Sequence, residues 1–99
     1  MFIAVNRIAA PPEAMDRMAG AFRQNAESLK RFAGFIAFEL WRDERTLEAV
    51  SKWESRAAFE TWRTSDDFLA SHASGRGGQG GQGSGSTVAY YECDLMVGR

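Results

Sequence analysis

The order of apolar patterns along the chain is the feature that most limits its fold. Four segments have the short apolar or alternating pattern of a β-strand, namely residues 2–9, 35–41, 47–53 and 87–97. Two others, residues 14–30 and the segment after Ser55, repeat apolar side chains at intervals of three and four, as amphipathic helices do. The chain therefore predicts the order strand, helix, strand, strand, helix, strand.

Boundary signals agree with that order. Pro11 and Pro12 end the first strand and suit the first turn of a helix, whereas Gly34 breaks the chain before the second strand. The polar turn 43–45 favours a hairpin, and Ser55 can cap the second helix. A further cap at 64–67 favours a new helix start near residue 68. The order β-α-β-β-α-β is that of the ferredoxin-like α+β fold, an antiparallel sheet with helices on one face.

The first two strands are apolar on both sides. In the segment 2–9, one face carries Phe2, Ala4 and Ile8, with Asn6 between the last two, and the other face carries Ile3 and Val5. In the segment 35–41, one face carries Ile36, Phe38 and Leu40, and the other carries Phe35, Ala37 and Trp41. Helices cover only one face of such a sheet, so a monomer would expose a large apolar patch on the other. We expect a homodimer, sheet against sheet with twofold symmetry, and a pocket between sheet and helices or at the dimer seam.

Composition excludes several classes of protein. A chain of 99 residues suits one domain, 1–99, and its net charge of −1 without a basic stripe argues against nucleic acid as a partner. The apolar start 1–5 is too short for a signal peptide or a membrane span. The single cysteine, Cys93, cannot form an internal disulfide and suits a reducing compartment. We expect a cytoplasmic protein with no membrane partner.

Residues 75–85 contain seven glycines in eleven positions, and Arg76 is their only charge. This composition is typical of a flexible tether, so we expect residues 75–86 to form a flexible loop within the single domain.

Three side chains are candidates for chemistry. His72, the only histidine, could serve as acid, base or metal ligand, or it could be an ordinary surface residue at a helix end. One histidine and one distant cysteine make a poor structural zinc site, whereas one histidine is enough for one axial ligand of heme iron. Asn6 lies in an apolar strand, either aimed into a pocket or facing solvent at a sheet edge. Trp62 is either a core residue or part of that pocket. The chain has no P-loop, GxGxxG, nucleophile elbow or HExxH motif.

Several segments together resemble a known family. They are Phe2–Ile8, Gly34–Phe35, Trp53–Trp62, Ser65–Phe68 and Ser71–His72. The combination is similar to the antibiotic biosynthesis monooxygenase (ABM) superfamily and, within it, to the IsdG-like heme-degrading monooxygenases. The resemblance spans nearly the whole chain except the glycine-rich segment. It implies a dimeric α+β barrel that binds heme as its substrate.

The resemblance also implies a role for each matching residue. His72 would be the axial ligand of the heme iron, and Asn6 would hydrogen-bond oxygen on the distal side. Trp62 would press on the macrocycle and distort it, while Phe22 would form an apolar wall. Arg76 is the candidate partner of a heme propionate. O2 and an external electron donor, a reductase, would drive ring cleavage and release iron. The porphyrin itself is oxidised, so no carboxylate pair is needed.

Two alternatives stay open. One is a cofactor-free monooxygenase of the same superfamily acting on a quinol or polyketide-like aromatic, which Asn6, Trp62 and His72 would position and deprotonate. The other is a non-catalytic protein that binds or stores heme.

Overall fold

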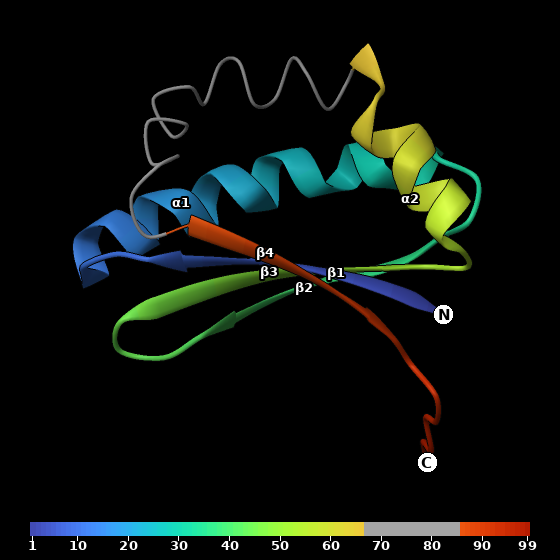
Figure 1. Ribbon diagram of the computed structural model, residues 1–99. Coiled ribbons are helices and arrows are strands. Elements are labelled where there is room, and N and C mark those ends of the chain that lie inside the picture. The colour runs from blue at the N-terminus through green and yellow to red at the C-terminus, as the bar shows by residue number, and fades with distance from the viewer. Residues whose placement is uncertain (67–85) are drawn as a thin grey trace.

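The computed structural model describes residues 1–66 and 86–99 and has two layers, with helices on one side of a four-stranded sheet (Figure 1). Every strand pair is antiparallel, and the strand order is β2-β3-β1-β4. The strands are β1 (Phe2–Ala9), β2 (Phe35–Arg42), β3 (Thr46–Trp53) and β4 (Ser86–Glu92). The helices are α1 (Pro12–Ala26), a 3-10 helix η1 (Glu27–Arg31) and α2 (Arg56–Arg63). The predicted ferredoxin-like α+β class is confirmed.

Local chemistry explains where the elements begin and turn. The Ser55 hydroxyl accepts a hydrogen bond from the Ala58 N–H at 3.2 Å, which caps α2. Asp43 Oδ1 accepts the N–H groups of Arg45 and Thr46 at 2.9 and 2.8 Å in the predicted β2–β3 turn. These two backbone hydrogen bonds lower the pKa of the Asp43 carboxyl below its usual range, and the bond from Arg45 has the larger effect.

Gly34 is required where the chain enters β2. Its φ is +86°, a left-handed conformation that side chains rarely adopt. A Cβ built there would lie 2.6 Å from the Cβ of Ala58. The glycine thus lets α2 approach the start of β2 closely.

The structure corrects three predicted boundaries. The first helix changes from α to 3-10 geometry after Ala26, whereas the pattern predicted one helix to Lys30. Strand β4 ends at Glu92, so the predicted strand to Val97 is too long. Ser86, assigned to the flexible loop, begins β4 because it pairs with Ile8 of β1. The predicted helix start near Phe68 and loop residues 75–85 lie outside the described residues.

A register shift in β2 corrects the predicted alternation. Pairing with β3 slips between Phe35 and Ala37, as a β-bulge does. Phe35 consequently lies edge-on to Trp53, with ring centroids 5.4 Å apart, on the same side as Phe38. The prediction that Phe35 shares a face with Ala37 and Trp41 is therefore wrong.

The two faces of the sheet differ in what covers them. On the helix face, a core of Phe2, Ala4, Leu29, Trp53 and Phe59 is buried under η1 and α2. The opposite side, here called the open face, carries from β1 the side chains of Ile3, Val5 and Arg7. Within the described part of the chain, no helix is long and apolar enough to cross a membrane.

Ion pairs cross the strands of the open face. Arg7 Nε lies 3.1 Å from Glu48 Oε2, and Lys52 Nζ lies 3.1 Å from Glu39 Oε2. Glu39 also accepts the Trp41 indole N–H at 2.9 Å. Both hydrogen bonds lower the pKa of the Glu39 carboxyl, and the bond from Lys52 has the larger effect. The charges of this face are thus paired within one chain.

Candidate functional site

Asn6 lies on the helix face in the middle of the sheet. Strand β1 is flanked by β3 and β4, and Asn6 sits between Ala49 and Val88 in the register. The edge-strand alternative for this residue is therefore wrong. Its amide is half-buried among apolar neighbours, where a polar group can recognise a ligand with few competing contacts.

Trp62 projects from α2 onto the core. Its ring stacks on that of Trp53 with centroids 5.5 Å apart and an interplanar angle of 24°. Phe59, three residues earlier on the same helix face, tilts against it at 6.0 Å. Trp62 remains half-buried, whereas Trp53 beneath it is fully buried. The stack holds the Trp62 indole in one orientation.

Phe22 of α1 packs across the helix face against Phe38 of β2, with ring centroids 5.8 Å apart. It is half-buried. Three of the predicted site residues, Asn6, Phe22 and Trp62, thus come from β1, α1 and α2 and share one side of the sheet. His72 and Arg76 lie outside the described residues.

Strand β4 adds two residues that sequence reasoning missed. Val88 is the β4 partner of Asn6, and Tyr90 packs on Phe2 and Phe59 at 5.7 and 5.6 Å. Although both belong to the helix side, Val88 is 56% and Tyr90 is 42% exposed in the chain. The alternation of residues along this strand places Val88 and Tyr90 on one face. It does not say whether that face is the one covered by the helices.

Arg56 links α2 to the sheet beside this surface. Its guanidinium carbon lies 5.6 Å from the centre of the Phe2 ring and 5.5 Å from that of Tyr90. Such cation–π contacts fix the start of α2 over β1 and β4. Trp62 lies on the same helix, six residues further along.

The helix face is rich in aromatic side chains. Aromatic and aliphatic carbons surround one carboxamide, and the described residues contain no group of three or more His, Cys, Asp or Glu that could hold a metal ion.

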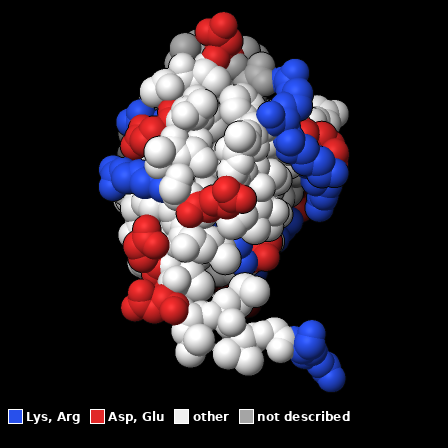
Figure 2. Space-filling model, turned by 90° about the vertical axis from the view of Figure 1, so that its right-hand side faces the viewer, with Lys and Arg blue, Asp and Glu red and all other residues white. Residues whose placement is uncertain are grey.

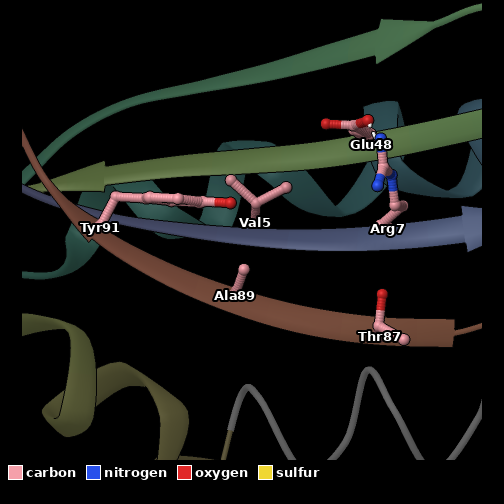
Figure 3. A pocket seen from close by; sticks show the side chains of 6 residues that line it. All are labelled: Val5, Arg7, Glu48, Thr87, Ala89 and Tyr91. Atoms are coloured by element: carbon pink, nitrogen blue, oxygen red, sulfur yellow. Dashed lines mark hydrogen bonds and ion pairs between the residues drawn. The ribbon is translucent and has the colours of Figure 1, made fainter.

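Two surface hollows lie away from this surface. One, of about 130 Å³, is on the open face and is lined by Val5, Arg7, Glu48, Thr87, Ala89 and Tyr91 (Figure 3). The other, of about 170 Å³, lies at the β2–β3 hairpin and is lined by Trp41, Arg42, Asp43, Thr46 and Glu48. Neither includes Asn6, Phe22 or Trp62.

Comparison with known proteins defines the class. The family model described as antibiotic biosynthesis monooxygenase matches residues 1–74, and the chain belongs to that family. The resemblance drawn from the sequence is thereby confirmed at the level of the family. The chain is thus of the monooxygenase type that this family describes.

Particular relatives include a heme degrader. The chain is 28% identical over 99 residues to a mycobilin-producing heme oxygenase of Mycobacterium tuberculosis, covering 97% of this chain and 91% of the relative. A structure of the heme degrader MhuD from that organism, with two hemes in its active site, matches with a TM-score of 0.74 and 25% identity, covering 99% and 100% of the chains. SnoaB, a cofactor-independent oxygenase from Streptomyces nogalater, shares the fold with a TM-score of 0.71 at 18% identity, covering 99% and 97%.

Proposed function

We propose that this protein binds heme and oxidatively opens the porphyrin with O2 and electrons from an external donor, releasing iron. The observation that carries the proposal is the 28% identity to a heme oxygenase along 97% of the chain. The helix face adds physical support. Asn6 is the polar group between Ala49 and Val88 on that face, and Trp62 is held on a buried stack.

The described residues fit such a ligand. Heme is broad, flat and largely apolar, so its binding site needs aromatic walls and few polar groups. Phe22, Trp62 and Val88 would supply the walls. His72 would hold the heme iron, and Arg76 would hold a propionate. A reductase would be the electron-donating partner.

Heme, when bound, supplies both the ring that is oxidised and the iron at which oxygen reacts. Asn6 lies on the ligand side of the sheet, and its carboxamide would donate or accept a hydrogen bond there. Trp62 presses on one side of the ligand, because its stack with Trp53 prevents it from tilting away. Phe22, packed on Phe38, would add an apolar wall that excludes water.

The proposal includes a homodimer in the cytoplasm. The open face carries Val5, Ala89 and Tyr91 without a covering helix, and its charges are paired internally. Two such faces can pack together without leaving like charges opposed. The lone Cys93 suits a reducing compartment.

A hemin titration followed by absorbance tests the function. We expect a Soret band that saturates near one heme per chain and disappears in His72→Ala. Asn6→Ala should retain the band but lose it more slowly when ascorbate is added in air. Gln24→Ala, an exposed change on α1, should match wild type in both steps.

Other results would replace the proposal. A band that persists under ascorbate would indicate storage of heme. No specific heme binding, together with consumption of an aromatic quinol without cofactor, would indicate the cofactor-free oxygenase instead. Wild-type behaviour of both variants would remove His72 and Asn6 from the site.

A further inference from the structure

One arginine stands at the rim of the helix face. The guanidinium of Arg56 lies over two aromatic rings, that of Phe2 at 5.6 Å and that of Tyr90 at 5.5 Å. Phe2 is buried and Tyr90 is exposed, so the guanidinium sits where the apolar core meets solvent. The ring contacts hold the side chain in place, while the edges of its planar group keep their N–H donors. Arg56 is thus a preorganised binding group for an anion.

The charge of Arg56 is only partly neutralised. Glu60 is its one ion-pair partner among the described residues, and the distance from Arg56 Nε to Glu60 Oε2 is 3.6 Å. Arg63 Nη1 lies 3.9 Å from the other oxygen of the same carboxylate. Both distances exceed that of a hydrogen bond, and two guanidiniums share one carboxylate. The charged side chains of α2 therefore leave one positive charge in excess.

Charges of both signs surround this arginine. Figure 2 shows the end of the molecule at which α2 and the N-terminus lie in Figure 1, and acidic and basic side chains are spread over it with uncharged residues between them. The net charge of the whole chain is −1. An anion at this end would therefore be bound by one particular guanidinium, because there is no general excess of positive charge to attract it.

Arg56 lies beside a strip of the helix face that is open to a ligand. On β4, Val88 and Tyr90 belong to this side of the sheet, and both are exposed. Val88 pairs with Asn6, and Tyr90 follows two residues later, about 6.5 Å along the strand. A porphyrin is wider than this spacing. A ring that lies on Asn6 and Val88, as the proposed function requires, would bring an edge to Tyr90 and Arg56.

We propose that Arg56 binds a carboxylate of the ligand, which in the proposed function is a propionate of heme. The inference rests on that function and gives a second cationic contact to a ligand that has two carboxylates. A guanidinium pairs with a carboxylate through two parallel N–H···O bonds, which fix direction as well as distance. Arg56 thus sets which edge of the ring lies at the start of α2.

Two forms of the ligand separate this contact from the rest of the site. Hemin has two free carboxylates, whereas in hemin dimethyl ester both are blocked and uncharged. We expect Arg56→Gln to weaken the affinity for hemin by about fivefold, a modest loss because the side chain is partly exposed to solvent. Its affinity for the ester should stay within about twofold of that of wild type, since the ester offers no anion to the guanidinium. Absorbance titrations at low salt measure both affinities, and high salt should reduce the loss for hemin.

Two further variants test the guanidinium itself. Arg56→Lys keeps the charge but lacks the planar fork, so it should recover only part of the lost affinity for hemin. Arg63→Gln removes the other cation that shares Glu60, at the far end of α2, and should bind both ligands as wild type does. Unchanged binding of the ester by Arg56→Gln would show that the site stays folded in that variant.

Other outcomes would overturn the contact. Equal affinity of wild type and Arg56→Gln for hemin would remove Arg56 from the ligand and leave the proposed function in place. An equal loss of affinity for hemin and for the ester would show that Arg56 acts only by holding α2 on Phe2 and Tyr90. A loss of the same size in Arg63→Gln would replace the specific contact with general electrostatic attraction. No specific binding of hemin by wild type would remove the proposed function, and this contact with it.

Discussion

The helix face of the sheet buries Trp53 completely, whereas the open face leaves Trp41 50% exposed. Both tryptophans lie on strands of one hairpin, and both faces carry apolar side chains. They differ in polar chemistry. The open face carries cross-strand ion pairs, as Glu39–Lys52 illustrates, while the helix face between β1 and β3 combines apolar side chains with Asn6 and buried Ser51. The chain therefore closes one face by itself and leaves the other suited to association.

The largest expected effect is in the helix-face core. Trp53→Ala should lower the free energy of unfolding by about 3–5 kcal/mol, because it leaves a cavity under Phe35, Phe59 and Trp62. Urea titration at fixed protein concentration measures the change. Trp53→Phe should cost much less, because a ring remains and the buried indole N–H, which has no partner in the described structure, is removed.

Trp41→Ala is the matched change on the open face. We expect a loss within about 1 kcal/mol for the isolated chain, because the side chain is half exposed. A loss as large as that of Trp53→Ala would contradict the distinction between the two faces.

The next effect concerns the ligand. Trp62→Ala should weaken heme binding by about tenfold, equivalent to about 1.4 kcal/mol, because the ligand loses the wall stacked on Trp53. Hemin titration of this variant beside Trp41→Ala compares two partly exposed tryptophans from opposite faces. Equal heme affinities in the two variants would show that Trp62 and the helix face do not form the heme site.

A smaller effect is expected at the start of α2. Ser55→Ala should cost about 1 kcal/mol, because the Ala58 N–H loses its acceptor. Urea unfolding gives the magnitude, and Ser55→Asp should recover most of it since aspartate also caps helices. An unchanged midpoint in Ser55→Ala would show that the cap does not contribute to the stability of α2.

Much of this architecture could be predicted from local signals. The apolar periods gave the element order, and the assignment of Asn6 to the same side as Phe2 and Ala4 is confirmed by the register. The β-bulge after Phe35 could not be foreseen, because strict alternation leaves no room for an extra residue. The end of β4 was placed too late for a related reason: apolar residues continue beyond Glu92 although their partner strand does not.

The candidate site was harder to predict than the fold. That Asn6 faces the helices from an inner strand depends on strand order, which is a property of distant segments rather than of neighbouring residues. The contribution of Val88 depends on how β4 pairs with β1 after the glycine-rich segment. The roles of His72 and Arg76 stay predictions, as these residues are outside the described structure.

The smallest expected effect probes the ion pairs of the open face by pH. Lys52 and Trp41 lower the pKa of Glu39, so its ionised form is favoured by folding. Its contribution is therefore present above the unfolded carboxyl range, near pH 4, and is lost as the pH falls through the lower folded pKa. Since the Glu39 side chain is 42% exposed, solvent screening limits this contribution to about 1 kcal/mol or less.

Glu39→Gln should thus lower stability slightly at pH 7 and show a shallower loss on acidification than wild type. Urea midpoints at pH 7 and pH 3, in low and high salt, give the comparison, and Glu44→Gln removes an exposed carboxylate from the adjoining turn as a control. High salt should reduce the difference between Glu39→Gln and wild type, because screening weakens the Lys52 attraction. If the two proteins lose stability in parallel down to pH 3, the Glu39–Lys52 pair does not contribute measurably to the stability of the chain.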